Sequence, residues 1–493
     1  MSYLLSLDQG TTSSRAIIFD EHGKVYASAQ RETQIKTPHS GWVEQDAMEI
    51  WTTQITVVQQ AIASARLLAK DIKALGLTNQ RETTVVWDKR TGKPLAPAIV
   101  WQDRRATDWC NQLVQNNLSE KIHKKTGLRI DPYFSAGKLV WLLENVQGLR
   151  ALAEQNHVAF GTVDSWLIWN LTQGSEHVIE ASNASRTMLM DLKTQQWDAE
   201  LIELFNIPAS VLPKIIQSDC YIANTATGLL GAEIPICGVL GDQQSALFGQ
   251  SCFEAGTAKN TYGTGCFMLF NTGTDIQYSK NKLLTTLAWK CQDQSHYALE
   301  GSVFMAGAIV QWLRDGLGII KNSAEVEKLA CQVDTTDGVV LVPAFTGLGA
   351  PHWDSEARAL LCGMSRGTNK SHIAKAALES IAFQVSDVLT AMQSDIAQPL
   401  KQLRVDGGAS QNDMLMQFQA DILNVPVLRP KLLESTAWGA AALAGLKAGV
   451  FNNLSEISES WQLDRAFEPK MSADQRQYHL SLWNGALQRA KSN

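Results

Sequence analysis

A short turn rich in glycine and hydroxyl side chains occurs twice in this chain, about half a chain apart. The first copy lies at residues 8–15, after an apolar strand-like segment, and the second lies at residues 259–265, before the apolar run 266–270. Repetition of one structural unit over such a distance indicates two similar domains that face each other across a cleft. We therefore expect domains of residues 1–250 and 251–493.

The segments around the first turn predict a layered α/β domain. Over residues 3–30, apolar strand-like runs alternate with polar turns, a pattern typical of a three-strand meander. Apolar side chains then recur at helical spacing from Met48 to Ala65, after a candidate helix cap at Asp46. Residues 72–77 form a short apolar run without a helical period. Strand, helix and strand thus alternate, and the ligands of such a domain bind at the ends of its strands.

Charge and cysteine pattern exclude several classes of protein. The chain has 43 basic and 49 acidic residues, without the basic excess typical of proteins that bind nucleic acid or anionic membranes. It has no run of eighteen or more apolar residues and no signal-peptide pattern, which predicts a cytoplasmic protein without membrane insertion. Its eight scattered cysteines lack metal-binding spacing and are expected to be reduced thiols of the core. Small molecules are the expected partners.

The first turn, residues 8–15, has the residue types that bind polyphosphate. Glycine lets the backbone approach an anion, while exposed N–H groups and hydroxyls donate hydrogen bonds. Asp8 beside these donors can hold a hydrated magnesium ion. A plain hairpin turn would explain Asp8 and Gly10, but it does not need the hydroxyl side chains together with Arg15. The chain has no Gly-x-x-x-x-Gly-Lys-Ser/Thr motif, so the phosphate site is not of the Walker type.

A candidate nucleotide segment occurs near the end of the chain. Residues 403–412 read as a strand followed by the paired glycines Gly407 and Gly408, and a helical pattern follows. A helix N-terminus that is approached through glycines suits a nucleotide, and Asn412 lies within reach of it. An ordinary turn between a strand and a helix is the alternative interpretation.

A candidate catalytic carboxylate follows the apolar segment 239–241. Asp242 can accept the proton of a substrate hydroxyl as that hydroxyl attacks the γ-phosphate, provided that the side chain is held in place. A helix cap is the alternative role for an aspartate at the end of a strand.

The adjacent charges Arg81 and Glu82 follow the strand predicted at 72–77. Such a pair is usually a solvated surface feature, but here it stands where a strand end faces a cleft. Arg81 can donate to one hydroxyl of a polyol and Glu82 can accept from another. Trp101 can add an apolar face for the carbon chain, although a buried tryptophan is more often part of the core.

Together these segments resemble the FGGY carbohydrate kinases over essentially the whole chain, and within that family the branch that acts on glycerol. Residues 8–15, 79–84 and 241–244 resemble the family's phosphate, polyol and catalytic segments, in that order. Residues 133–145 and 363–384 are similar to its two signatures. The resemblance implies an α/β fold with two ribonuclease H-like domains, of the actin and hexokinase ATPase type, that face each other across a catalytic cleft.

The resemblance also implies a role for each candidate site residue. Asp242 is implied as the general base, and Asp8 matches the residue near magnesium. The residues implied to contact glycerol are Arg81, Glu82, Trp101, Tyr133, Asp242, Gln243 and Phe267. The positions that match the family's ATP and ADP sites are Thr11, Thr12, Ser13, Arg15, Thr264, Gly307, Gln311, Gly408 and Asn412.

The implied reaction is transfer of the γ-phosphoryl group of Mg-ATP to a terminal hydroxyl of glycerol, which gives sn-glycerol 3-phosphate and ADP in glycerol uptake and catabolism. ATP and Mg²⁺ are the implied cofactors, and a homodimer or homotetramer is the implied assembly. Two alternatives stay open. One is a kinase for another small polyol or a ketose on the same scaffold, and the other is a nucleotide-driven switch of the actin or chaperone kind.

The sequence of residues 227–235 predicts that two kinds of regulation of activity found in this branch are absent. Many bacterial members are inhibited by fructose 1,6-bisphosphate through a Gly-Gly-Thr-Arg loop, and others carry a loop histidine that a sugar-transport phosphocarrier phosphorylates. Here Glu233 stands where the arginine would fall, Leu230 and Ala232 replace the glycine and the hydroxyl, and the stretch has no histidine. A carboxylate repels the phosphate that a guanidinium would bind.

We therefore expect the activity to be insensitive to both controls. Activity is titrated with millimolar fructose 1,6-bisphosphate at several enzyme concentrations, and a second sample is incubated with the phosphocarrier system. Saturable inhibition, or activation that depends on the phosphocarrier, would show that the interpretation of residues 227–235 is wrong.

Overall fold

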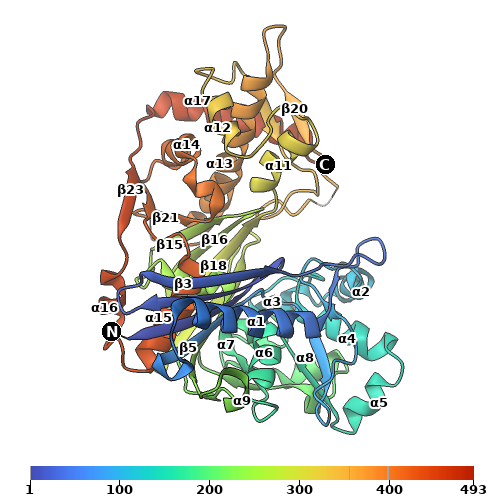
Figure 1. The fold of residues 1–493 in the computed structure, drawn as a ribbon. Coiled ribbons are helices and arrows are strands. Elements are labelled where there is room, and N and C mark those ends of the chain that lie inside the picture. The colour runs from blue at the N-terminus through green and yellow to red at the C-terminus, as the bar shows by residue number, and fades with distance from the viewer. Residues whose placement is uncertain (1, 355, 397–398, 493) are drawn as a thin grey trace.

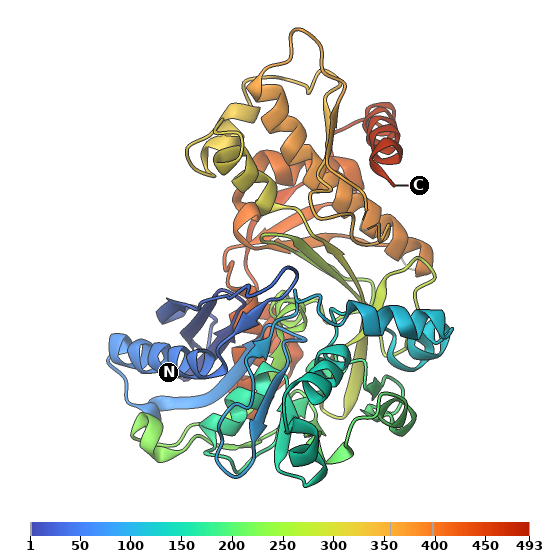
Figure 2. The ribbon, with the colours of Figure 1, turned by 90° about the vertical axis from the view of Figure 1, so that its right-hand side faces the viewer.

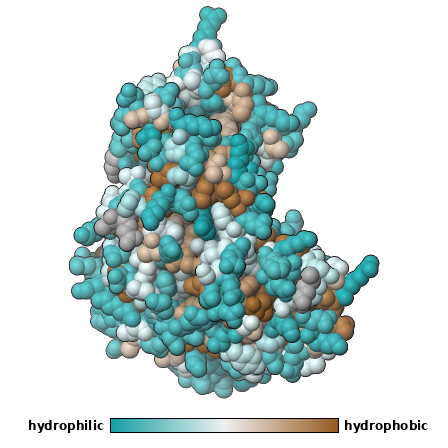
Figure 3. Space-filling model, turned by 90° about the vertical axis from the view of Figure 1, so that its left-hand side faces the viewer, coloured by the Kyte–Doolittle hydropathy of each residue, from teal (hydrophilic) through white to brown (hydrophobic). Residues whose placement is uncertain are grey.

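The computed structural model describes residues 2–354, 356–396 and 399–492. It has two lobes, one above the other in Figure 1, and each is built around a mixed β-sheet. The surface in Figure 3 is largely hydrophilic, and hydrophobic side chains gather near the waist between the lobes. No helix among the described residues is both long enough and apolar enough to cross a membrane.

The first sheet has the strand order β13-β14-β5-β1-β2-β3. Its strands are β1 (Tyr3–Gln9), β2 (Ser13–Asp20), β3 (Val25–Glu32), β5 (Ile72–Asn79), β13 (Ala223–Asn224) and β14 (Pro235–Gly241). β1 to β3 form the predicted antiparallel meander, and β5 confirms the strand that was expected at residues 72–77. β14 and β5 pair in parallel, as do β5 and β1, so three neighbouring strands end at one edge of the sheet.

Both faces of the first sheet are buried. Successive side chains of a strand point to opposite faces, so neighbouring residues of β1 lie in different cores. Leu5 and Leu7 lie in one core with residues of α1 (Ala47–Ala65). This helix is the one predicted from the spacing of its apolar residues, and the Asp46 carboxylate caps it by accepting from the N–H groups of its first turn. Leu4 lies in a different core, which also contains residues of α15 (Ser435–Lys447).

The helix α15 comes from the last sixth of the chain, yet it lies with the strands of the lower lobe (Figure 1). It packs closely on α10 (Asp242–Gly249), which follows β14. Glycines make this approach possible, because an added Cβ at Gly439 would lie 1.9 Å from the Ser245 carbonyl oxygen and one at Gly76 would lie 2.0 Å from that of Ala440. The helix α15 therefore packs both on the strands of the first sheet and on the helix that begins at Asp242.

The second sheet has the order β17-β18-β16-β15-β21-β22-β23. Its strands are β15 (Ala258–Tyr262), β16 (Cys266–Gly273), β17 (Leu284–Cys291), β18 (Gln294–Val303), β21 (Leu403–Asp406), β22 (Val427–Pro430) and β23 (Leu463–Phe467). β15 and β16 flank the second glycine turn as predicted. β21 leads through the paired glycines Gly407 and Gly408 into α14 (Asp413–Leu423). The long helix α13 (Lys370–Asp395) crosses the upper lobe over these strands (Figure 2).

Short elements complete both lobes. In the lower lobe they are β4 (Glu44–Gln45), η1 (Ala69–Asp71), β6 (Val85–Asp88), β7 (Ala98–Ile99), α2 (Thr107–Gln115), α3 (Ser119–Thr126), α4 (Ser135–Asn145), α5 (Leu149–Glu154), β8 (Val158–Gly161), α6 (Val163–Leu171), β9 (Val178–Glu180), α7 (Ala181–Ala184), β10 (Met190–Asp191), β11 (Gln196–Trp197), α8 (Ala199–Leu204), η2 (Ala209–Val211), β12 (Lys214–Ile216) and α9 (Thr227–Leu230). The others are α11 (Gly307–Asp315), α12 (Glu325–Ala330), β19 (Val340–Val342), β20 (Leu360–Cys362), η3 (Gly408–Gln411), α16 (Leu454–Glu459) and α17 (Ala473–Ala490).

The eight cysteines form no disulfide. Five of them are buried, as expected of core thiols, namely Cys110, Cys237, Cys252, Cys266 and Cys291. Cys331 is exposed at the end of α12, so the expectation of a core position was wrong for this residue.

The contact of α15 with α10 gives a test of the fold. Substitution Gly439→Ala should lower the free energy of unfolding by about 1–3 kcal/mol, because the new methyl group meets backbone atoms at Ser245 that cannot move aside alone. Urea unfolding measures the change. The matched control is Gly485→Ala in α17, where an added Cβ meets no atom within 4 Å and should raise the stability by up to about 1 kcal/mol. Equal effects of the two substitutions would contradict the packing.

Candidate functional site

The parallel strands of the first sheet bring three charged residues of the predicted site together. Asp8 on β1 is level with Thr78 on β5, and the strand ends Asn79 and Gly241 are also level with each other. The chain continues from these ends into the Arg81 loop and into α10. The Arg81 Nε lies 3.2 Å from Asp242 Oδ1. Three segments far apart in sequence thus meet at one edge, where ligands of α/β sheets bind.

Asp242 is held in place and is still accessible. Its side chain is 29% exposed, whereas that of Arg81 is 2% exposed. Asp242 Oδ1 also accepts from the N–H group of Gln243 at 2.7 Å. Gly241 occupies the N-cap of α10, so Asp242 lies in the first helical turn and the cap interpretation does not apply to it.

The Arg81-Glu82 pair lies in a tight, buried turn. Glu82 has a φ of 60°, in the left-handed region that residues with a side chain seldom adopt, and the N–H of Thr83 donates to the Arg81 carbonyl at 2.7 Å. Arg81 is 3% exposed and Glu82 is 1% exposed, so the alternative of a solvated surface pair is excluded. Backbone strain of this kind concentrates at functional sites.

Two charged residues that were not anticipated from the sequence complete a buried network. Arg81 makes two bonds to the Glu300 carboxylate, Nη1 to Oε2 at 2.5 Å and Nη2 to Oε1 at 3.0 Å. Arg186 donates to Glu82 Oε1 at 2.6 Å and to Glu300 Oε1 at 2.9 Å. Burial by itself raises the pKa of Glu300, but Arg186 and Arg81 outweigh that effect and hold it at about 2. Glu300 is therefore a carboxylate at neutral pH.

The side chains of Trp101, Tyr133 and Phe267 form an aromatic wall beside these charges. The ring centroids of Trp101 and Tyr133 are 5.7 Å apart, and those of Trp101 and Phe267 are 6.4 Å apart. Trp101 Nε1 donates to Thr11 Oγ1 at 2.9 Å, which joins the wall to the first phosphate turn. The buried amine of Lys138 donates to the carbonyl oxygen of Tyr133 and fixes the backbone there. Lys138 is a further residue that sequence reasoning missed.

Gln243 also has a partner that was not anticipated. The Lys259 amine donates to Gln243 Oε1 at 2.5 Å and to Thr261 Oγ1 at 2.9 Å. Burial lowers the pKa of Lys259 to about 8. Lys259 lies on β15 of the second sheet, so this contact joins the two lobes next to Asp242.

The first phosphate turn lies at the same edge. The backbone of Thr11 and Thr12 is fixed, because their carbonyl oxygens accept from Gln45 Nε2 and from the N–H of Thr33. The hydroxyl-bearing residues at the turn, Thr11, Thr12 and Ser13, are not buried. Arg15 forms an ion pair with Glu434, the N-cap residue of α15.

Asp8 is the candidate residue near magnesium. Burial raises the pKa of Asp8 to about 6, and the charge of Arg15 offsets part of this effect. The described residues contain no group of three or more His, Cys, Asp or Glu side chains that could hold a metal ion. Magnesium in kinases keeps several waters and is bound by one or two carboxylates together with substrate phosphates. The single carboxylate of Asp8 beside the hydroxyl turn fits that mode of binding.

The second set of positions that the resemblance assigns to the nucleotide gathers at one edge of the second sheet. β15 and β21 pair in parallel, with Thr261 level with Asp406, so the turns after these strands are neighbours. The N–H groups of Gly307 and Ala308 donate to the carbonyl oxygens of Gly263 and Thr264. The positions brought to this edge are Thr264, Gly307, Gln311, Gly408 and Asn412.

Asn412 has a structural bond in addition to its predicted role. Its carboxamide oxygen accepts from the N–H of Leu415 at 2.8 Å and caps α14. An added Cβ at Gly407 would lie 2.5 Å from the Tyr262 carbonyl oxygen, which explains the first glycine of the pair as a close backbone contact. Gly408 is exposed, and no atom lies within 4 Å of the position that its Cβ would take, so a ligand can approach the backbone there.

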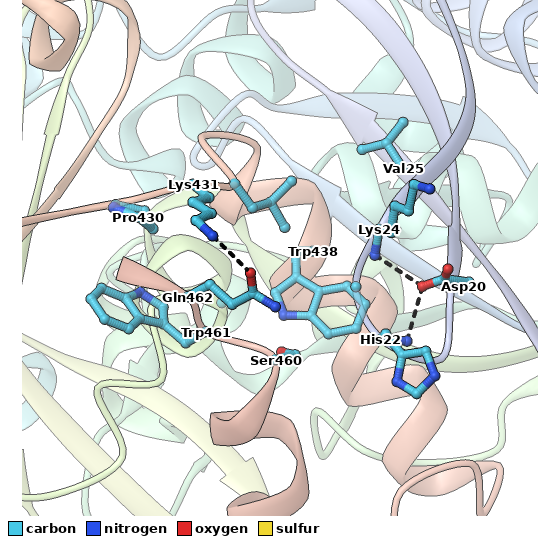
Figure 4. A pocket seen from close by; sticks show the side chains of 13 residues that line it. Asp20, His22, Lys24, Val25, Pro430, Lys431, Trp438, Ser460, Trp461 and Gln462 are labelled. Atoms are coloured by element: carbon cyan, nitrogen blue, oxygen red, sulfur yellow. Dashed lines mark hydrogen bonds between the residues drawn. The ribbon is translucent and has the colours of Figure 1, made fainter. Parts of the chain in front are cut away.

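A cavity of about 420 Å³ lies elsewhere, where the chain passes between the lobes (Figure 4). Its wall is formed by the β2–β3 turn, by the end of α10, and by the segments 430–432 and 460–462. It contains none of the predicted site residues. The candidate site is therefore the set of strand ends described above, rather than this cavity.

Two family models match most of the chain. The N-terminal domain of the FGGY family of carbohydrate kinases matches residues 3–249, and the C-terminal domain of that family matches residues 258–448. The chain is 78% identical to the glycerol kinase of Acinetobacter baylyi over the full length of both proteins. It is 55% identical to the glycerol kinase of Deinococcus radiodurans, over 99% of this chain and 97% of that protein.

Solved structures show the same architecture. The glycerol kinase of Plasmodium falciparum with ADP superposes with a TM-score of 0.94 at 39% identity, over 99% of this chain and 98% of that one. A xylulose kinase from Lactobacillus acidophilus, at 22% identity, has a TM-score of 0.89 over 99% and 98% and shows the likeness of fold alone. These matches confirm the predicted two-domain α/β fold. The chain belongs to the FGGY family of carbohydrate kinases.

Proposed function

We propose that this protein transfers the γ-phosphoryl group of Mg-ATP to a terminal hydroxyl of glycerol, which gives sn-glycerol 3-phosphate and ADP. The observation that carries this function is the placement of Asp242. Its accessible carboxylate stands beside the buried Arg81 and at the edge that also holds the phosphate turn. The glycerol kinases of two bacteria, at 78% and 55% identity over nearly the whole chain, support glycerol as the acceptor.

Asp242 acts as the general base of this reaction. The hydroxyl of glycerol attacks the γ-phosphate and passes its proton to the carboxylate. The bonds of Asp242 Oδ1 to the Gln243 N–H and the ion pair with Arg81 fix the direction of the carboxylate. The second oxygen, Oδ2, makes no bond within the part of the chain that the structure describes and is free for the substrate.

Glycerol is held between charges and an aromatic wall. Arg81 donates to one hydroxyl and Glu82 accepts from another, while Tyr133 and Gln243 provide further polar contacts. Trp101 and Phe267, whose rings meet edge to face with centroids 6.4 Å apart, cover the carbon chain. Moving a polyol from water into such a site costs little free energy of desolvation, because each hydroxyl regains a hydrogen bond.

The nucleotide lies between the two glycine turns. Thr11, Thr12 and Ser13 donate to the phosphates from the first lobe, and Arg15 contributes charge there. Thr264, Gly307, Gln311, Gly408 and Asn412 hold the rest of the nucleotide from the second lobe. Asp8 would hold the magnesium ion, which would supply positive charge to neutralise the phosphates of the nucleotide.

We propose that the reaction takes place in the cytoplasm. All eight cysteines are unpaired, which is the usual state of thiols in a reducing compartment.

Closure of the lobes over both substrates keeps water from the γ-phosphate, since water competes with glycerol for the same group.

A substrate panel tests the proposed function. Glycerol, dihydroxyacetone, other small polyols, ketopentoses and hexoses are each assayed for consumption of ATP with and without magnesium. We expect glycerol to give by far the highest kcat/KM and magnesium to be required. Preference for a ketose would favour the other sugar kinases of this scaffold, and ATP turnover that is independent of any acceptor would favour a nucleotide switch.

Asp242 is tested by the substitution Asp242→Asn, which keeps the size of the side chain but cannot accept a proton. We expect kcat to fall by about 10²–10⁴-fold, with glycerol and ATP still bound in calorimetric titrations. The matched control is Asp474→Asn, at an exposed position in the first turn of α17, which should leave kcat unchanged. A kcat close to wild type in the Asp242 variant would exclude this residue as the base.

A further inference from the structure

Four charged side chains form a buried ring under the polyol site. Arg81 and Arg186 both bond Glu300, and Arg186 also bonds Glu82. The Arg81 Nε lies 3.8 Å from Glu82 Oε1, which closes the ring. None of the four side chains is more than 2% exposed. Two positive and two negative charges balance, so the ring is neutral as a whole.

Stability does not explain such a ring. Removing ions from water costs several kcal/mol each, and apolar residues of similar volume often stabilise a protein as well or better. The ring is also incompletely bonded, because Arg186 Nη1 is buried without a hydrogen-bond partner in the described part of the chain. A group of charges retained at this cost indicates a function beyond stability.

The members of the ring differ in their access to a substrate. Arg81 contacts Asp242, and Glu82 lies in the strained turn next to it. Arg186 lies behind the polyol site, with its guanidinium carbon 5.6 Å from the ring centroid of Tyr133 and 5.4 Å from that of Phe134. Among the described residues, the carboxylate of Glu300 bonds only the two arginines, and it uses both its oxygens to do so.

Glu300 comes from the other lobe. It lies on β18, where it is level with Leu269 on β16 and with Leu284 on β17 of the second sheet. Arg81, Glu82 and Arg186 all belong to the lower lobe. The same strand β16 carries Phe267, one ring of the aromatic wall. The second lobe thus reaches the polyol site through an apolar ring and through a carboxylate, in addition to the contact of Lys259 with Gln243.

We infer that Glu300 and Arg186 are positioning residues for the polyol, which they orient by holding Arg81 and Glu82 in the directions needed to bond its hydroxyls. This inference rests on the proposed function. Glu300 accepts from both terminal nitrogens of the Arg81 guanidinium, Nη1 and Nη2, and so fixes its orientation. Arg186 donates to one oxygen of Glu82 and fixes that carboxylate. The other oxygen of Glu82 has no hydrogen-bond partner among the described residues and is left to accept from the substrate. Because Glu300 belongs to the second sheet, the orientation of Arg81 also depends on how the two lobes are seated.

Single and paired substitutions test the inference. Glu300→Gln leaves the ring with one excess positive charge, and Arg186→Gln leaves it with one excess negative charge. The double variant is neutral again. We expect each single variant to raise the KM for glycerol about tenfold or more, while the KM for ATP changes by no more than about twofold, because the lost bonds orient only the polyol contacts. Arg186→Lys, which keeps the charge and loses the fork, should lie between wild type and Arg186→Gln.

Stability is measured on the same proteins. Each single variant should unfold at a lower temperature than wild type, and the double variant should recover a large part of that loss because its ring is balanced. The KM for glycerol should stay raised in the double variant. A control that is destabilised for another reason is Leu171→Ala, a fully buried position in the core of the first lobe, which should lower the melting temperature and leave the KM for glycerol unchanged.

Each outcome has one meaning. A raised KM for glycerol in the stable double variant, with an unchanged KM in Leu171→Ala, supports positioning. A KM that follows the melting temperature through all variants, or that stays at the wild-type value in the singles, overturns the inference and makes the ring structural. If wild type itself does not phosphorylate glycerol, the proposed function fails first, and calorimetric binding of the preferred acceptor from the substrate panel replaces the KM measurement.

Discussion

The parallel pairing of β1, β5 and β14 is the constraint on which the rest of the site depends. Parallel strands that lie in register present their carboxyl ends at one edge, so Asp8, the Arg81 turn and Asp242 meet although they are encoded far apart. The strands are buried on both faces, which requires a helix on each side of the sheet. α1 supplies one helix locally, and α15 supplies the other from near the end of the chain.

The return of α15 to the first lobe ties the turn at residues 8–15 to α10, the helix that begins at Asp242. Its N-cap residue Glu434 pairs with Arg15 of the first phosphate turn, and its glycine lies against the helix that begins at Asp242. Glu300 and Lys259 make the opposite connection, since both belong to the second sheet and bond polar side chains of the first lobe. Chemistry that needs two substrates in one place is thereby supported from both lobes, through contacts that a single domain could not provide.

The buried charges illustrate how a protein carries ions inside a cleft. A lone buried guanidinium or carboxylate would shift its pKa or destabilise the fold. Here the two arginines hold the pKa of Glu300 at about 2, so Glu300 stays ionised. The nearby carboxylates raise the pKa of both arginines, which stay charged. The more exposed Asp242 at the edge of this arrangement is then the carboxylate that solvent and substrate can reach.

Local sequence determined the elements and many candidate residues of the site. The meander, the helix from Ala47, the two glycine turns and Asp242 depend on side chains a few positions apart, and their patterns are visible along the chain. Arg186, Glu300 and Lys259 carry no such pattern. Arg81 and Glu300 are 219 positions apart, and Arg186 and Glu300 are 114 apart. Only the packing of two sheets against each other decided these pairs, because a charge finds its partner through burial in three dimensions and not through spacing in the chain.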